Sequence, residues 1–176
     1  LERVMQGLAA TGEKGLLEIV AAAHSGVSTE EFARAVREWT VNARHPRFNR
    51  PYTELVYQPM LELLDYLRAN GFKTFIVTGG GIDFVRVVSE RLYGIPPEQV
   101  VGSSVKTQFE NHGERPRIRK LPELRSFDDR DEKAVNIDLH IGRRPILAFG
   151  NSDGDLTMLR YTLAGPGARL GLILHH

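Results

Sequence analysis

The 176-residue chain contains no cysteine, which excludes disulfide bridges, a cysteine nucleophile and thiolate metal sites. A chain without cysteine suits the cytoplasm and the bacterial periplasm equally well, so the compartment stays open. No apolar run approaches the roughly 20 residues of a membrane-spanning helix, and we expect no membrane partner. The formal net charge is only +1, so no basic excess points to nucleic acid.

The residues that are present are those of a globular protein. With 41% hydrophobic and 26% charged residues, the chain is long enough to bury one sizeable core beside a small accessory subdomain. Its first residue is Leu1 and not Met, and it ends on two histidines directly after an apolar run. We expect both ends to be cut, so a missing targeting segment carries no information.

Residues 1–50 have the apolar spacing of helices and no alternating run typical of a strand. Ser28 and Glu31 form a capping-box pattern, which predicts that a helix begins at Ser28. Residues 43–52 contain two prolines and three arginines without periodicity, which is typical of a linker. We therefore predict a helical subdomain over 1–50 and an α/β unit over 51–176.

The α/β unit alternates helical and strand patterns. Helices are predicted over 58–69, 82–92 and 134–141, and strands over 73–78, 99–102, 105–109, 117–121, 146–149 and 170–174. The two strands on either side of residues 111–113 are expected to form a hairpin. Helix and strand alternating in this way predict a Rossmann-like parallel sheet with helices on both faces, plus the small helical cap.

A threonine and three glycines follow the strand predicted over 73–78. Thr78 offers a hydroxyl, and Gly79 and Gly80 offer backbone N–H groups at a helix start, which together can hold a phosphate. The alternative is an ordinary tight turn. The spacing of these glycines matches neither a Walker loop nor a dinucleotide-binding fingerprint.

A second polar loop follows the strand predicted over 146–149. Asp153 and Asp155 supply oxygen atoms of the kind that hold a divalent cation at the carboxyl end of a strand. Acidic residues that stabilise a helix start without any metal are the alternative. Lys133 stands after an acidic stretch and just before the predicted helix over 134–141, where its charge can neutralise a phosphoryl group. An ordinary solvated surface lysine is the alternative.

Thr78 with its glycine loop, then Lys133, then the loop at 150–155 occur in an order that resembles the haloacid dehalogenase superfamily of phosphohydrolases. The overall layout resembles its phosphoserine-phosphatase-like branch. The resemblance implies that Thr78, Gly79, Gly80 and Lys133 bind the phosphoryl group and that Asn151, Asp153 and Asp155 bind Mg²⁺. It also implies that residues 1–50 are a cap and that the substrate is a small phosphorylated metabolite.

Two features depart from the family pattern. The metal loop begins Gly150-Asn151 where the family usually has Gly-Asp, and an amide oxygen is a weaker Mg²⁺ ligand than a carboxylate. No apolar strand followed by Asp-x-Asp lies between Leu1 and Asn70, although the family's attacking carboxylate belongs to such a motif. The only Asp-x-Asp-x-Thr runs from Asp153 to Thr157, and its use as nucleophile would require a circular permutation.

The resemblance therefore implies that the nucleophile strand lies upstream of Leu1, central in the sheet between the strands that end at Thr78 and Phe149. Without that strand two buried edges lack partners, which is costly. We expect a trimmed chain, or a chain that receives this strand from another copy in a homo-oligomer. By itself the chain is then expected to be inactive.

Two other functions fit parts of the sequence. A non-catalytic phosphate-binding or scaffold domain would keep the fold without the nucleophile, and Asn151 favours it mildly. A nucleotide-dependent oxidoreductase using the glycine loop lacks both the glycine spacing and an acidic residue on the following strand. The leading prediction is a Mg²⁺-dependent phosphohydrolase that acts through an aspartyl-phosphate.

Overall fold

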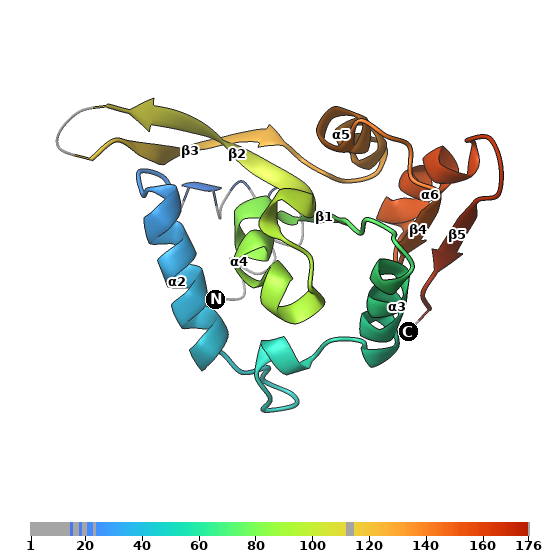
Figure 1. Ribbon diagram of the computed structural model, residues 1–176. Helices are drawn as coiled ribbons and strands as arrows, with labels where there is room; N and C mark the ends of the chain where they lie inside the picture. The colour runs from blue at the N-terminus through green and yellow to red at the C-terminus, as the bar shows by residue number, and fades with distance from the viewer. Residues whose placement is uncertain (1–14, 16–17, 19–20, 23, 112–114, 176) are drawn as a thin grey trace.

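The computed structural model describes residues 15, 18, 21, 22, 24–111 and 115–175 (Figure 1). Its strands form two small sheets. The first has the order β1-β2-β3 and contains β1 (Ile76–Gly81), β2 (Val100–Glu110) and β3 (Arg117–Ser126). The second contains β4 (Leu147–Gly150) and β5 (Leu170–Ile173).

The helices confirm most of the predicted pattern. They are α2 (Thr29–Asn42), α3 (Gln58–Ala69), α4 (Ile82–Tyr93), α5 (Asp131–Ile141) and α6 (Leu156–Leu163), with short 3₁₀ turns at Tyr52–Glu54, Pro97–Gln99 and Asp153–Asp155. Both capping-box bonds form at the start of α2, from Ser28 N to Glu31 Oε2 at 2.7 Å and from Glu31 N to Ser28 Oγ at 3.1 Å. Most of the helical pattern expected before Ser28 lies outside the described residues. No helix in the described ranges is long and apolar enough to cross a lipid bilayer.

The predicted single Rossmann-like sheet is divided in two. β1 pairs in parallel with β2, and β4 pairs in parallel with β5, but β1 and β4 do not pair with each other. One buried cluster joins the two sheets: it contains Ile137 of α5 and Ala148 of β4, and Val77 of β1 packs against it. This cluster thus aligns the carboxyl ends of β1 and β4 without any backbone ladder between them.

Strand β2 is much longer than the predicted short strand at 99–102. Its first residues pair in parallel with β1, and its later residues pair with β3 as an antiparallel hairpin that extends to one side of the molecule (Figure 1). Irregular pairing between Ser104, Val105 and Thr107 lets one strand bend out of the sheet into the hairpin. The predicted strand at 99–102 and the predicted hairpin arm are therefore one element.

Helix α5 also begins earlier than predicted. It starts at Asp131, so Lys133 lies in its first turn and not before the helix. The residue before it, Arg130, has φ 51° and ψ −117°, a backbone conformation that L-residues rarely adopt. Its N–H donates to Gly154 O at 3.1 Å, which joins the start of α5 to the loop after β4.

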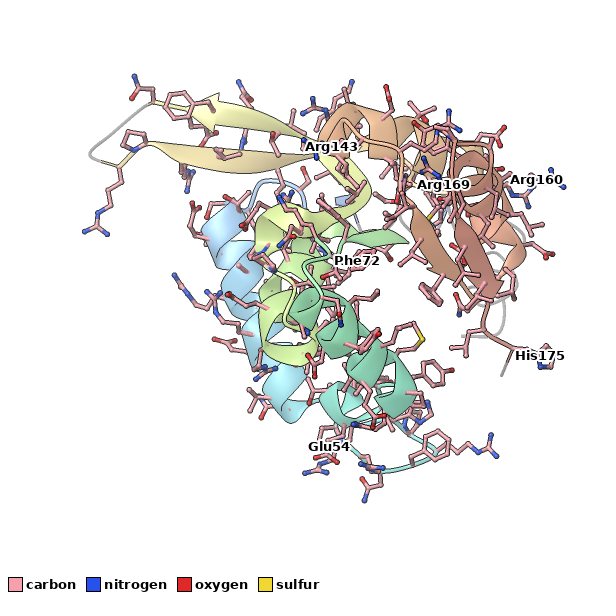
Figure 2. All side chains as sticks on the ribbon, turned by 45° about the vertical axis from the view of Figure 1, so that its right-hand side comes forward. Glu54, Phe72, Arg143, Arg160, Arg169 and His175 are labelled. Atoms are coloured by element: carbon pink, nitrogen blue, oxygen red, sulfur yellow. The ribbon has the colours of Figure 1, made fainter. Side chains whose placement is uncertain are left out.

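Arg169 connects the segments that precede the two strands of the C-terminal sheet through hydrogen bonds to backbone carbonyl groups. Figure 2 shows Arg160 and Arg169 in this part of the molecule. Arg169 Nη1 donates to Pro145 O at 2.6 Å, and Arg169 Nε donates to Pro166 O at 2.8 Å. These bonds hold the segments before β4 and β5 together.

Lys120 of β3 joins the helical N-terminal part to the α/β unit. Its side chain is 6% exposed, its ammonium group pairs with Asp83 of α4, and it lies 4.5 Å from the ring centroid of Phe32 on α2. Its backbone also bonds to both Gly26 N and Val27 O at 2.9 Å. Three elements therefore depend on one lysine.

Lys120→Met keeps the aliphatic stem but leaves Asp83 without its partner. Because Asp83 is 30% exposed, we expect the free energy of unfolding to fall by about 1–3 kcal/mol, less than for a fully buried pair. Denaturant unfolding measures the change. In a double-mutant cycle, Asp83→Asn should cost less in the Lys120→Met background than in the wild type, whereas strictly additive effects would show that the pair contributes nothing.

Candidate functional site

The glycine loop predicted to follow Thr78 is part of the strand: β1 begins at Ile76, later than the predicted residue 73, and ends at Gly81. Its pairing with β2 is irregular between Thr78 and Gly81, and this irregular end of β1 is what we call the glycine loop. Thr78 Oγ1 accepts a hydrogen bond from Gly80 N at 3.1 Å, and Gly81 then starts α4 without a side-chain cap. Thr78 lies opposite Gly102 of β2, where a Cβ atom would come within 2.9 Å of Thr78 Cγ2 and 3.0 Å of Gly80 O. Gly102 is thus needed for the loop to fold over β2.

Lys133 connects the two halves of the site. Its side chain is 5% exposed; Nζ donates to Val77 O at 3.0 Å and lies 3.3 Å from Asp155 Oδ1. Val77 directly precedes Thr78, so the lysine brings the carboxyl end of β1 next to the loop after β4. The structure therefore brings together three predicted site residues, Thr78, Lys133 and Asp155, from three separate segments.

Asp155 organises the loop that follows β4. Its Oδ2 accepts hydrogen bonds from Asn151 N at 2.9 Å and Ser152 N at 3.1 Å, while its Oδ1 faces Lys133. The residue is 7% exposed. Gly150 is required here, because a Cβ atom at this position would lie 2.4 Å from Asp155 Cβ.

The predicted Mg²⁺ ligands differ in their exposure and in their contacts with other groups of the protein. Asn151 and Asp153 are exposed, whereas both oxygen atoms of Asp155 are already engaged by Lys133 and the loop N–H groups. No group of three or more His, Cys, Asp or Glu residues in the described ranges is arranged to hold a metal ion. Mg²⁺ commonly keeps several water molecules and binds through one or two carboxylates and a substrate phosphate, so the exposed carboxylate of Asp153, with the neighbouring Asn151, would be the group to hold it.

The sequence pattern missed a group of buried polar residues behind the site. Ser103 Oγ donates to Gly79 O at 2.7 Å and accepts from Asp128 N at 2.9 Å, and Asn136 Nδ2 donates to Asp128 Oδ1 at 2.9 Å. These three residues are 0–4% exposed. They come from β2, a loop and α5, and nothing in the sequence spacing links them.

Asp128 is fully buried, and its Oδ2 has no hydrogen-bond partner. Burial raises the pKa of this carboxyl above the ordinary 3.8, although the hydrogen bond from Asn136 and the charge of Lys133 act in the opposite direction. The residue therefore holds its proton more strongly than an exposed aspartate does.

Comparison with known proteins places the chain in a family. A family model described as haloacid dehalogenase-like hydrolase matches residues 1–160. The chain belongs to the haloacid dehalogenase-like hydrolase family. The resemblance that Thr78, Lys133 and the loop at 150–155 suggested is thus confirmed at the level of the family.

A solved structure supports the fold of this haloacid dehalogenase-like chain. It is a phosphoserine phosphohydrolase-like protein from Francisella tularensis subsp. tularensis SCHU S4, with a TM-score of 0.51 and 17% sequence identity. The match covers 93% of this chain and 74% of that one. At this identity the likeness concerns the fold alone. No curated protein matches the chain.

Gly150→Ala tests the packing between the metal loop and Asp155. The added Cβ atom must displace the Asp155 side chain, and we expect the free energy of unfolding to fall by about 2 kcal/mol. Gly81→Ala is the matched control, since a Cβ atom there meets nothing within 4 Å and its φ is −64°, so its effect should stay within about 0.5 kcal/mol. Equal effects of the two substitutions would contradict the packing described here.

Asp128→Asn tests the cost of the buried carboxyl. Below the ordinary pKa of 3.8 the carboxyl is protonated in the folded and unfolded states, so its ionisation does not affect stability. As pH rises from there through the raised folded pKa, the unfolded state loses its proton first and the wild type becomes less stable. The advantage of the variant in melting temperature should therefore grow between pH 4 and pH 7, and an advantage that shrinks over this range would contradict the raised pKa.

Proposed function

We propose that the complete protein is a Mg²⁺-dependent phosphatase that acts on a small phosphomonoester through an aspartyl-phosphate. The observation that carries the proposal is the position of Lys133, whose ammonium group joins the carboxyl end of β1 to Asp155. A buried cation beside a threonine hydroxyl and a glycine loop suits a phosphoryl group, which is both anionic and rich in hydrogen-bond acceptors.

We further propose that the attacking carboxylate is carried by a strand that fits between β1 and β4. Two observations support this. The sheets are separate at this point. In addition, helix α3 has no buried residue, although Met60, Leu61, Leu63, Leu64 and Leu67 give it an apolar face. A strand between the sheets would complete both hydrogen-bond ladders and give apolar residues something to pack against.

In this proposal each residue has a distinct task. Thr78 and the N–H group of Gly79 orient the phosphoryl oxygens, while the Gly80 N–H donates to Thr78 Oγ1 and holds that hydroxyl in place. Lys133 neutralises the charge that develops during transfer. Asp155 keeps Lys133 in place and shapes the loop that presents Asn151 and Asp153. Bound Mg²⁺ would supply further positive charge beside the phosphoryl group.

The proposal of a small substrate is supported by a small cavity beside the glycines of β1. A cavity of about 50 Å³ lies between Phe32 of α2, Lys120 of β3 and the start of α4. Gly81 and Ser103 also line it, which places it next to the glycine loop. This volume holds roughly three or four water molecules, so it accommodates only a few non-hydrogen atoms of a leaving group.

A non-catalytic phosphate-binding domain is the second candidate. It is favoured by Asn151, a neutral residue where the family usually has an acid, and by the engagement of both Asp155 oxygens within the protein. Such a domain would bind phosphate at the same loop and release no product.

Phosphate release from small phosphomonoesters, with and without Mg²⁺, separates the two functions. We expect hydrolysis by the protein made from the complete coding sequence and none by the 176-residue chain. Sustained Mg²⁺-dependent hydrolysis by the chain alone would instead support the Asp153–Thr157 segment as nucleophile. Binding of phosphate without hydrolysis by the complete protein would establish the second candidate.

Within the complete protein, Lys133→Met should lower kcat/KM about 10²- to 10³-fold, as expected for the loss of one group that stabilises transition-state charge. The matched control is Lys106→Met on the exposed part of the hairpin, which should leave kcat/KM unchanged. An equally active Lys133→Met variant would remove the main support for the proposed mechanism.

A further inference from the structure

We infer that Ser103, Asp128 and Asn136 are positioning residues, which fix the glycine loop against helix α5 and thereby set the place of Lys133 beside the phosphate site. The inference rests on the proposed function, but it concerns residues that the sequence pattern did not single out. We call these three residues the buried path.

The first step of the buried path fixes one peptide plane. Gly79 O and Gly80 N belong to the same planar peptide unit and point in opposite directions. Ser103 Oγ donates to Gly79 O at 2.7 Å, and Thr78 Oγ1 accepts from Gly80 N at 3.1 Å. This peptide unit therefore has one hydrogen bond on each side, and the two bonds fix the orientation of the Gly79–Gly80 peptide in the proposed phosphate site.

The second step extends from the loop to the helix that carries the lysine. Ser103 Oγ also accepts from Asp128 N at 2.9 Å, and Asp128 Oδ1 accepts from Asn136 Nδ2 at 2.9 Å. Asn136 donates in addition to Ser126 Oγ at 3.0 Å. It lies three residues after Lys133 on α5, so the two side chains occupy the same side of the helix.

The alternative is that these bonds only stabilise the fold, as buried polar groups generally do when they are paired. The position of the three residues argues against this. Their bonds form one continuous set that begins at Gly79 O, passes through Ser103 and Asp128, and reaches Asn136 on α5. The buried path therefore ends at both halves of the site, at Gly79 and beside Lys133.

The test uses the complete protein and four variants. Ser103→Ala removes the bond to Gly79, Asp128→Ala removes the link to α5, and Asp128→Asn retains an acceptor for Asn136. Ser89→Ala is the matched control, because Ser89 is also fully buried but its hydroxyl donates to Arg86 O of its own helix. Ser103→Cys replaces Ser103→Ala if the latter does not fold.

Three quantities are measured: hydrogen exchange of the Gly80 amide, the NMR signals of the Lys133 ε-methylene group, and the Kd for inorganic phosphate. Ser103→Ala should speed Gly80 exchange, and Asp128→Ala should shift the Lys133 signals. Each should raise the phosphate Kd about tenfold, the change expected from losing one buried hydrogen bond. Asp128→Asn should restore the Lys133 signals and the Kd toward wild-type values.

The inference is overturned if Ser103→Ala and Asp128→Ala change Gly80 exchange and the Lys133 signals no more than Ser89→Ala does. It is also overturned if Asp128→Asn perturbs Lys133 as strongly as Asp128→Ala. A wild-type protein that binds no phosphate contradicts the proposed function instead, because the exchange and NMR comparisons still decide whether the buried path positions the loop and the lysine.

Discussion

The buried ammonium group of Lys133 is the interaction on which the arrangement of the site depends. Removing a charge from water costs several kcal/mol unless the charge is paired and hydrogen-bonded. Lys133 meets this requirement with Val77 O and Asp155 Oδ1, one from each half of the molecule. Because Asp155 must then also be satisfied, it takes the N–H groups of Asn151 and Ser152, and Gly150 must lack a side chain. The ammonium group of Lys133 therefore constrains the conformation of both segments, the end of β1 and the loop after β4.

The sequence predicted which residues meet but not how the sheet supports them. Strands that run in parallel end at one edge, which is why Thr78 and Asp155 could be placed together from their positions after apolar runs. The division into two sheets could not be derived from those runs, because a strand pattern does not show whether its edge is paired. Helix α5 contributes to the alignment, since Ile137 lies in one cluster with Ala148 and Val77 packs against that cluster.

The buried path was invisible in the sequence for a different reason. Ser103 lies 24 residues from its partner Gly79 and 25 from Asp128. Such side-chain bonds have no period along the chain, unlike a helix face or a capping box. A similar limit applied to Lys120: its position in a predicted hairpin gave no sign that it would be buried between Phe32 and Asp83.

The negative charge near Lys133 affects how strongly the site would repel an incoming phosphate. Two carboxyl groups, those of Asp155 and Asp128, act on this single lysine, and two full negative charges would outweigh its positive one. Burial raises the pKa of Asp128, so this group resists ionisation and weakens the repulsion that an anion would meet. The fully hydrogen-bonded Asp155 can hold the lysine, while Asp128 contributes geometry with less charge. In the proposed phosphatase, the same desolvation that makes Asp128 costly for folding would leave the site more favourable to a phosphoryl group.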